Sequence, residues 1–161
     1  MKKRWLCLFV ENEVGVLARI TGLFSAKAYN LNSLTVGVTQ DETVSRVTIS
    51  LFSDDQIFEQ IKKQLNRMVE VIKVIDYTDI DIYRKEIMFI KILKCTEYDR
   101  AFLFQFSDIY GTRILDFNND SVLMESIKTE EENNFMLQLL YRKMDKLFEI
   151  VRGGSVAVEA V

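Results

Sequence analysis

The chain has 161 residues, of which 48% are apolar, and its 24 acidic residues outnumber its 21 basic residues to give a net charge of −3. This composition supports a buried core for one ordinary domain or two small ones, and it excludes a disordered chain. The positive charges are scattered along the sequence, which argues against a nucleic-acid-binding surface.

The first half of the chain predicts a strand, a helix, two strands, a second helix and a fourth strand. Apolar side chains recur at helical spacing from Val16 to Phe24, and they alternate with polar ones from Val47 to Leu51. Ser53 and Gln56 predict a capping box that opens the second helix. The expected elements are 5–10, 16–24, 31–38, 47–51, 57–68 and 69–74.

The second half repeats this order of elements at a spacing of about 75 residues. Its first helix is rich in Phe, which makes the period ambiguous, and its second helix opens with a capping box at Thr129 and Glu132. A turn is expected at Gly153-Gly154. The expected elements are 87–93, 101–109, 112–117, 122–127, a helix with Phe135, Leu139, Leu140 and Met144 on its buried stripe, and 147–151.

A βαββαβ order places both helices on one face of an antiparallel four-stranded sheet. We therefore expect an α+β chain of two ferredoxin-like units in tandem. The alternating acids from Asp76 to Tyr83 break the pattern and predict a linker. The predicted domains are residues 1–76 and 85–161, with the linker at 77–84. Cores of this size favour oligomerisation through sheet edges.

A polar turn before the first helix is the most specific functional signal in the sequence. Asn12 and Gly15 precede this helix, and Asn30 and Leu31 follow its end. The N–H groups at a helix N-terminus favour a carboxylate, and glycine lets a ligand approach the backbone. The hypothesis is a site for a small amino acid in the first domain only, because the second lacks the Asn-x-x-Gly turn. The alternative is that these residues simply turn the chain and end the helix.

The residues around this turn resemble a known family. The string FVENEVGVLARITGLFS at 9–25, followed by YNLNSLTV at 29–36, is similar to the ACT domain of acetolactate synthase small regulatory subunits. The resemblance spans nearly the whole chain and is more specific in the first half. Its further segments are 45–49, 60–66, 84–91 and 149–154.

The resemblance implies a regulatory subunit with no catalytic residues of its own. Such a subunit binds the large catalytic subunit of acetolactate synthase, raises its activity and confers feedback inhibition by valine in branched-chain amino-acid biosynthesis. It also implies a homodimer through the ACT domains, in which Asn12, Gly15 and Val16 of one chain meet Asn30 and Leu31 of the other around valine. Thiamine diphosphate, Mg²⁺ and FAD are expected only on the catalytic subunit. The residues leave valine, isoleucine and leucine open as effectors.

Two positions depart from the pattern of this family. Ala28 stands where glycine is usual, and Val38 stands where proline is frequent. A left-handed backbone at position 28 would cost alanine about 1 kcal/mol.

Other functional classes have weaker support from the sequence. A free-standing ACT-type module that senses an amino acid for another enzyme or regulator stays an alternative. An enzyme on this scaffold is disfavoured, because the chain has no histidine, no Gly-rich phosphate loop and no nucleophile elbow. No compact group of ligands predicts a metal site.

The remaining features indicate a cytoplasmic protein. No segment predicts a membrane span, and the apolar run Trp5–Val10 is too short for the core of a signal peptide. Cys7 and Cys95 lie in apolar, strand-like runs, which favours buried reduced thiols over a disulfide.

Overall fold

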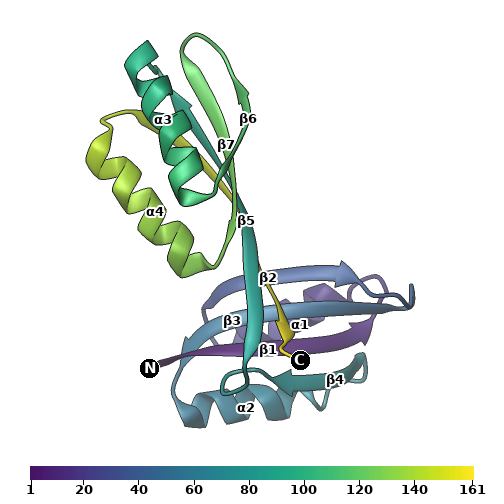
Figure 1. Cartoon of the computed structure of the whole chain (residues 1–161). Helices are drawn as coiled ribbons and strands as arrows, with labels where there is room; N and C mark the ends of the chain where they lie inside the picture. Colours follow the sequence, from purple (N-terminus) through teal and green to yellow (C-terminus); the bar gives the residue numbers. More distant parts are fainter. The chain divides into compact units, whose positions relative to one another are not determined.

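The chain folds into two compact units in the computed structural model, which describes residues 1–161 (Figure 1). The first unit contains Met1–Tyr83 and Ser155–Val161, and the second contains Arg84–Gly154. The elements in chain order are β1 (Lys2–Glu11), α1 (Val16–Ala26), β2 (Leu31–Val38), β3 (Val44–Ser53), α2 (Asp55–Leu65), β4 (Val71–Asp76), β5 (Ile82–Leu93), α3 (Glu97–Tyr110), β6 (Arg113–Phe117), β7 (Ser121–Lys128), α4 (Glu130–Lys143) and β8 (Leu147–Glu159).

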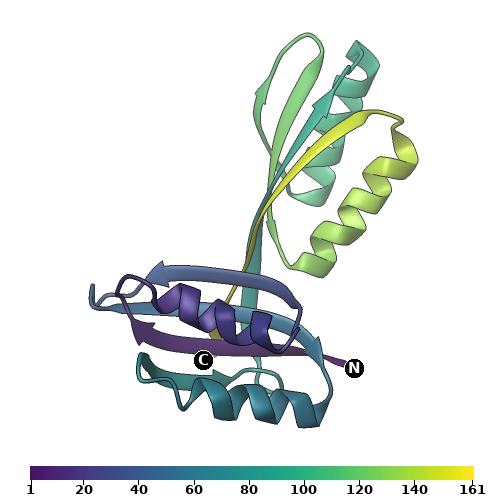
Figure 2. The same ribbon diagram turned by 180° about the vertical axis from the view of Figure 1, so that it is seen from behind.

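Each unit is built on one four-stranded antiparallel sheet. The strand orders are β2-β3-β1-β4 in the first unit and β6-β7-β5-β8 in the second. The two central strands of the first sheet, β1 and β3, pair along their whole length, from Lys2 with Ser53 to Glu11 with Val44. Helices α1 and α2 lie on the same face of this sheet (Figures 1 and 2). The predicted α+β chain of two ferredoxin-like units is confirmed.

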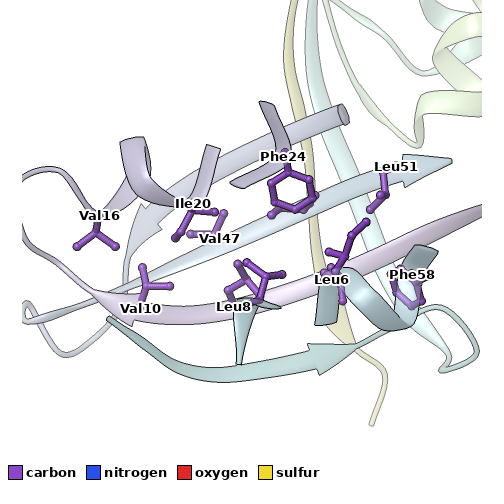
Figure 3. Close-up of a cluster of buried hydrophobic side chains, with 12 residues drawn as sticks. Leu6, Leu8, Val10, Val16, Ile20, Phe24, Val47, Leu51 and Phe58 are labelled. Carbon is purple, nitrogen blue, oxygen red and sulfur yellow. The ribbon is translucent and has the colours of Figure 1, made fainter. Parts of the chain in front are cut away.

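The core of the first unit lies between the sheet and its two helices (Figure 3). Helix α1 contributes Val16, Ile20 and Phe24, which share one face at the predicted spacing. Burying one such side chain contributes about 1.5–3 kcal/mol, so this cluster holds the helices on the sheet. Its buried members are Leu6, Leu8, Val10, Val16, Ile20, Phe24, Val47, Ile49, Leu51, Phe58, Ile61 and Leu65.

The start of α2 differs from the prediction. The sequence pattern predicts Ser53 as the cap of this helix, but Ser53 is the last residue of β3 and pairs with Lys2 in the ladder. The N-cap is Asp54, whose Oδ1 accepts a hydrogen bond from the Ile57 N–H at 2.8 Å. Because strand pairing extends through Ser53, the cap lies one residue later than predicted.

The opposite face of the first sheet is also covered. Trp5 and Cys7 project from β1 on this side and pack with Tyr77 and Ala157 in a second buried cluster. Antiparallel sheets commonly leave one face to water, so β1 is unusual in being buried on both sides. The cover comes from the segment after β4 and from residues 155–161.

The compact units and the predicted domains have different limits. Tyr77 falls in the predicted linker, yet only 4% of its surface is exposed. Residues 155–161 fall in the predicted second domain, yet they belong to the first unit. The predicted turn at Gly153-Gly154 is wrong, because β8 continues through both glycines to Glu159. Gly154 has φ +78°, a conformation that glycine adopts without steric cost and that irregular strands use.

The second unit repeats the architecture of the first. Helix α3 begins at Glu97 rather than near residue 101, because Thr96 and Asp99 form a capping box that the prediction missed. The predicted capping box at Thr129 and Glu132 is confirmed. The buried core consists of Met88, Ile90, Ile92, Cys95, Leu103, Phe106, Val122, Met124, Met136, Leu137, Leu140 and Met144.

The predicted buried stripe of α4 is confirmed at Leu140 and Met144, with Leu139 packed against the core, and is wrong at Phe135. Phe135 is 58% exposed, whereas Asn133 is fully buried. The Asn133 Nδ2 donates to Glu86 Oε1 at 2.9 Å, and its Oδ1 accepts from Ser126 Oγ at 2.7 Å. Arg152 Nε donates to the same Glu86 oxygen at 3.1 Å. The position is therefore set by a polar network that an apolar pattern does not reveal.

Both cysteines are buried and unpaired, as the sequence predicted. Burial and the Asp99 carboxylate raise the pKa of Cys95, which keeps its thiol protonated. None of the helices has the length and apolar character needed to cross a membrane.

Ala28 provides a test of backbone strain. Its φ is +54°, in the left-handed region, where the chain leaves α1 through a hydrogen bond from Tyr29 N–H to Phe24 O at 2.9 Å. Ala28→Gly should raise the free energy of unfolding by about 0.5–1 kcal/mol, because glycine adopts this conformation freely. The measurement is chemical denaturation. Ala18→Gly, at an exposed position inside the helix, is the control and should be destabilising by a similar amount. Equal losses of stability in both variants would contradict the assignment of strain to Ala28.

Asp99 provides a test of acid sensitivity in the second unit. The hydrogen bond from Lys146 Nζ, at 2.8 Å, and those from Thr96 hold the pKa of Asp99 at about 2. Because this folded-state pKa lies below the usual value of about 3.9, the ionised group stabilises the fold above pH ~4, and this is lost as the pH falls toward 2.

Asp99→Asn should therefore lower the free energy of unfolding by about 1–2 kcal/mol at pH 7. It should also flatten the fall in stability between pH 5 and 2, measured by denaturation at each pH. The exposed Asp108→Asn on the same helix is the control and should keep the wild-type pH profile. If the stability of wild type and of Asp99→Asn falls in parallel between pH 5 and 2, the Asp99 carboxylate does not cause the acid sensitivity.

Candidate effector site at the ends of helix α1

The turn between β1 and α1 is fastened by Asn12. Its backbone N–H donates to Thr43 O at 2.7 Å, and its side-chain Nδ2 donates to Glu42 O at 2.8 Å. Its Oδ1 accepts from Ser45 Oγ at 3.0 Å. Asn12 thus ties the end of β1 to the loop between β2 and β3. An amide oxygen has two lone pairs, so Oδ1 keeps the capacity to accept one further hydrogen bond.

Gly15 opens helix α1 in a left-handed conformation, with φ +88°. It offers no side-chain cap, and the first turn of the helix contains no acidic residue. The N–H groups of this turn therefore carry the partial positive charge of a helix N-terminus without a protein carboxylate to satisfy it. A Cβ at position 15 would lie 3.2 Å from Arg19 Nη1, so the absence of a side chain keeps this approach open.

Val16 and Arg19 form the flanks of this turn. Val16 is buried, with 2% of its surface exposed, and belongs to the core below the helix start. Arg19 Nε is 2.6 Å from Glu70 Oε1, so its charge is balanced within the unit. The helix start therefore rests on the apolar side chain of Val16 and is flanked by Arg19, which is already paired with Glu70.

Asn30 and Leu31 lie at the other end of α1. The Asn30 side chain is exposed and makes no hydrogen bond within the chain, while Leu31 is partly buried against the first core. The register of β2 against β3 shifts between Leu31 and Ser33, which marks a bulge at Asn32. Bulges redirect side chains beside functional sites, and here Leu31 faces the core while Ser33 faces the opposite side.

One chain does not bring the two halves of the predicted site together. Asn12, Gly15 and Val16 lie at the start of α1, and Asn30 and Leu31 lie beyond its end. A helix of 11 residues is about 16 Å long, which exceeds the reach of one small amino acid. A shared site therefore requires a second copy, as the sequence-based expectation of a homodimer states; the effector-binding residues stay a prediction.

The groups at the helix start suit recognition of a ligand. They consist of backbone N–H donors, amide oxygens and apolar side chains, which bind a carboxylate, an ammonium group and an aliphatic side chain respectively. No group of three or more His, Cys, Asp or Glu residues is placed to hold a metal ion. Sequence reasoning missed Glu42, Ser45 and Arg19, which position or flank Asn12 and Gly15. Their partners are distant in sequence, so no local pattern marks them.

Comparisons with known proteins give a consistent result. A family model described as an AHAS small subunit-like ACT domain matches residues 6–73, and one described as the small subunit of acetolactate synthase matches residues 85–161. The acetolactate synthase small subunit of Aquifex aeolicus is 34% identical over 158 residues, which cover 98% of this chain and 81% of that protein. The probable acetolactate synthase small subunit of Archaeoglobus fulgidus is 36% identical over 156 residues, which cover 97% of this chain and 96% of that protein.

A solved structure agrees with these matches. The crystal structure of the acetolactate synthase small subunit from Thermotoga maritima superposes with a TM-score of 0.87 and 28% sequence identity, covering 100% of this chain and 99% of that one. The agreement extends across both units and both family models. On this combination of sequence and fold, the chain belongs to the acetolactate synthase small-subunit family.

Proposed function

We propose that this chain is the regulatory subunit of acetolactate synthase in branched-chain amino-acid biosynthesis. It binds the large catalytic subunit, raises its activity and confers feedback inhibition by valine. The observation that carries the proposal is a match to small subunits over 97–98% of the chain, combined with an uncapped helix start in the first unit. The chemistry on thiamine diphosphate, with Mg²⁺ and FAD, belongs to the catalytic subunit in the cytoplasm.

The contacts available at the helix start fit a free amino acid. The carboxylate of valine would accept hydrogen bonds from the N–H groups of Leu17 and Ala18, because the Val16 N–H already donates to Glu13 O at 3.3 Å. The free lone pair of Asn12 Oδ1 and the unpaired Asn30 amide of a second chain would bind the ammonium group. Leu31 would line the aliphatic end, while Val16 supports the helix start from the core beneath it.

The effector would act through the dimer. Because its two sets of contacts lie on different chains, valine binding favours the arrangement in which two first units face each other across α1 and β2. Strand β2 is an edge strand, which leaves one side free for such a contact. The catalytic subunit accepts some of these arrangements better than others, so the ligand shifts the population toward a less active complex.

Asn30→Ala tests this proposal with little structural cost, because the side chain is exposed and makes no hydrogen bond within the chain. In the complex with the large subunit, it should raise the valine concentration for half-inhibition by about tenfold, as expected for one lost charge-assisted hydrogen bond. Activation at zero valine should stay at the wild-type level. The measurement is acetolactate formation against valine concentration.

Two further variants sharpen this experiment. Gly15→Asp should also relieve inhibition, because its carboxylate occupies the anion position and repels that of valine. Asn66→Ala, which removes a hydrogen bond to Lys62 O at the end of α2, is the control and should keep the wild-type inhibition curve. Loss of activation together with inhibition in Asn30→Ala would mean that this end of α1 has a structural role. A wild-type chain that neither activates nor inhibits the large subunit would overturn the function itself.

A further inference from the structure

Residues 155–161, which we call the strap, cross the face of the first sheet opposite to its helices. The end of the chain, marked C in Figure 1, lies against this sheet. Ser155 is 2% exposed, and Ala157 is 7% exposed within the cluster of Trp5, Cys7 and Tyr77. The strap is therefore part of the fold of the first unit.

Side chains hold the strap in place. Ser33 Oγ accepts from Ser155 N–H at 3.1 Å, and Thr35 Oγ1 donates to Ser155 O at 3.0 Å. Arg46 Nη2 donates to Ala157 O at 2.7 Å and to Tyr77 Oη at 3.1 Å. Each such bond contributes about 0.5–1.5 kcal/mol net. Backbone bonds add to them, because β8 is hydrogen-bonded to β5 and the Ala160 N–H donates to Asp81 O at 2.9 Å. Only Ser155 and Ala157 are buried within the strap, so it opens more readily than the core below it.

Strand β2 connects the strap to the candidate effector site. Ser33 and Thr35 lie on the same strand as Leu31, which begins β2 directly after Asn30. Leu31 and Leu34, on either side of the bulge at Asn32, face the core, whereas Ser33 and Thr35 bind the strap. A ligand that orders Asn30 and Leu31 therefore acts on a strand whose opposite face carries two of the strap contacts.

We propose that attachment of the strap to β2 is coupled to occupation of the effector site at Asn30 and Leu31. This inference rests on the proposed function, since it needs an effector at that site. The strap is the end of β8, whose first half, Leu147–Gly154, belongs to the second unit. A change in strap attachment caused by the effector would thus act on β8, a strand that the second unit shares. By thermodynamic reciprocity, loosening the strap must also change the apparent affinity for the effector.

Arg46→Met is the variant that tests this coupling. It keeps an apolar stem over Phe9, where the guanidinium lies 5.6 Å from the ring centroid, and removes the bonds to Ala157 and Tyr77. Arg67→Met replaces an exposed arginine in the same unit and is the matched control. Thr35→Val removes a single strap bond and gives the same readout with a smaller perturbation, should Arg46→Met fail to fold.

Two measurements are made on the complex with the large subunit. Hydrogen exchange of amides 155–161 is followed with and without valine, and inhibition is titrated with valine. We expect valine to change exchange in the wild-type strap by about fivefold or more. Arg46→Met should speed this exchange about tenfold and shift the valine concentration for half-inhibition by about fivefold or more, with core amides of β1 unchanged. Arg67→Met should leave both the strap exchange and the valine concentration for half-inhibition at their wild-type values.

The outcomes separate the two proposals. If Arg46→Met or Thr35→Val opens the strap while the inhibition curve stays at wild type, the strap is only structural and the coupling is overturned. The coupling is also overturned if valine inhibits the wild-type complex but leaves strap exchange unchanged. If valine does not inhibit the wild-type complex at all, the effector role under the proposed function fails, and the coupling fails with it.

Discussion

Burial of β1 on both faces is the constraint on which the first unit depends. Leu6 and Leu8 meet the helices, while Trp5 and Cys7 meet Tyr77 and Ala157 on the other side. A strand that exposes neither face to solvent must be packed on both sides, and α1 and α2 pack on only one of them. The second layer comes from segments that a sequence pattern assigns elsewhere. The apolar run at Trp5–Val10 thus determines both the helical layer and the segment that closes the far face.

Most of the architecture follows from local patterns in the sequence. The helical spacing of Val16, Ile20 and Phe24 and the capping box at Thr129 describe features that depend on neighbours within a few residues. The errors have one physical cause, which is tertiary context. Strand pairing took Ser53 from the cap of α2, and a polar network drew Asn133 into the core that the pattern gave to Phe135.

The candidate site also contains residues that local sequence patterns identify and residues that only tertiary contacts reveal. Gly15 is identifiable because an Asn-x-x-Gly string marks a turn before the helix, and the structure places it at the helix start with φ +88°. The roles of Glu42 and Ser45 are not identifiable, because they contact Asn12 across 30 and 33 positions of sequence. The separation of the two halves of the site could be anticipated, because they flank the predicted helix. The structure adds the length of α1, about 16 Å, which exceeds the reach of one small amino acid.

The discontinuity of the first unit has a consequence for its synthesis. Its two parts, Met1–Tyr83 and Ser155–Val161, are separated in the chain by the whole of the second unit. Chain growth from the N-terminus delivers every residue of Arg84–Gly154 before the strap leaves the ribosome. Until then Cys7 and Trp5 lack part of their cover, so the nascent first unit carries an apolar face that a chaperone or a second copy could meet. The inserted unit is fully synthesised first, and the earlier unit receives its last segment only afterwards.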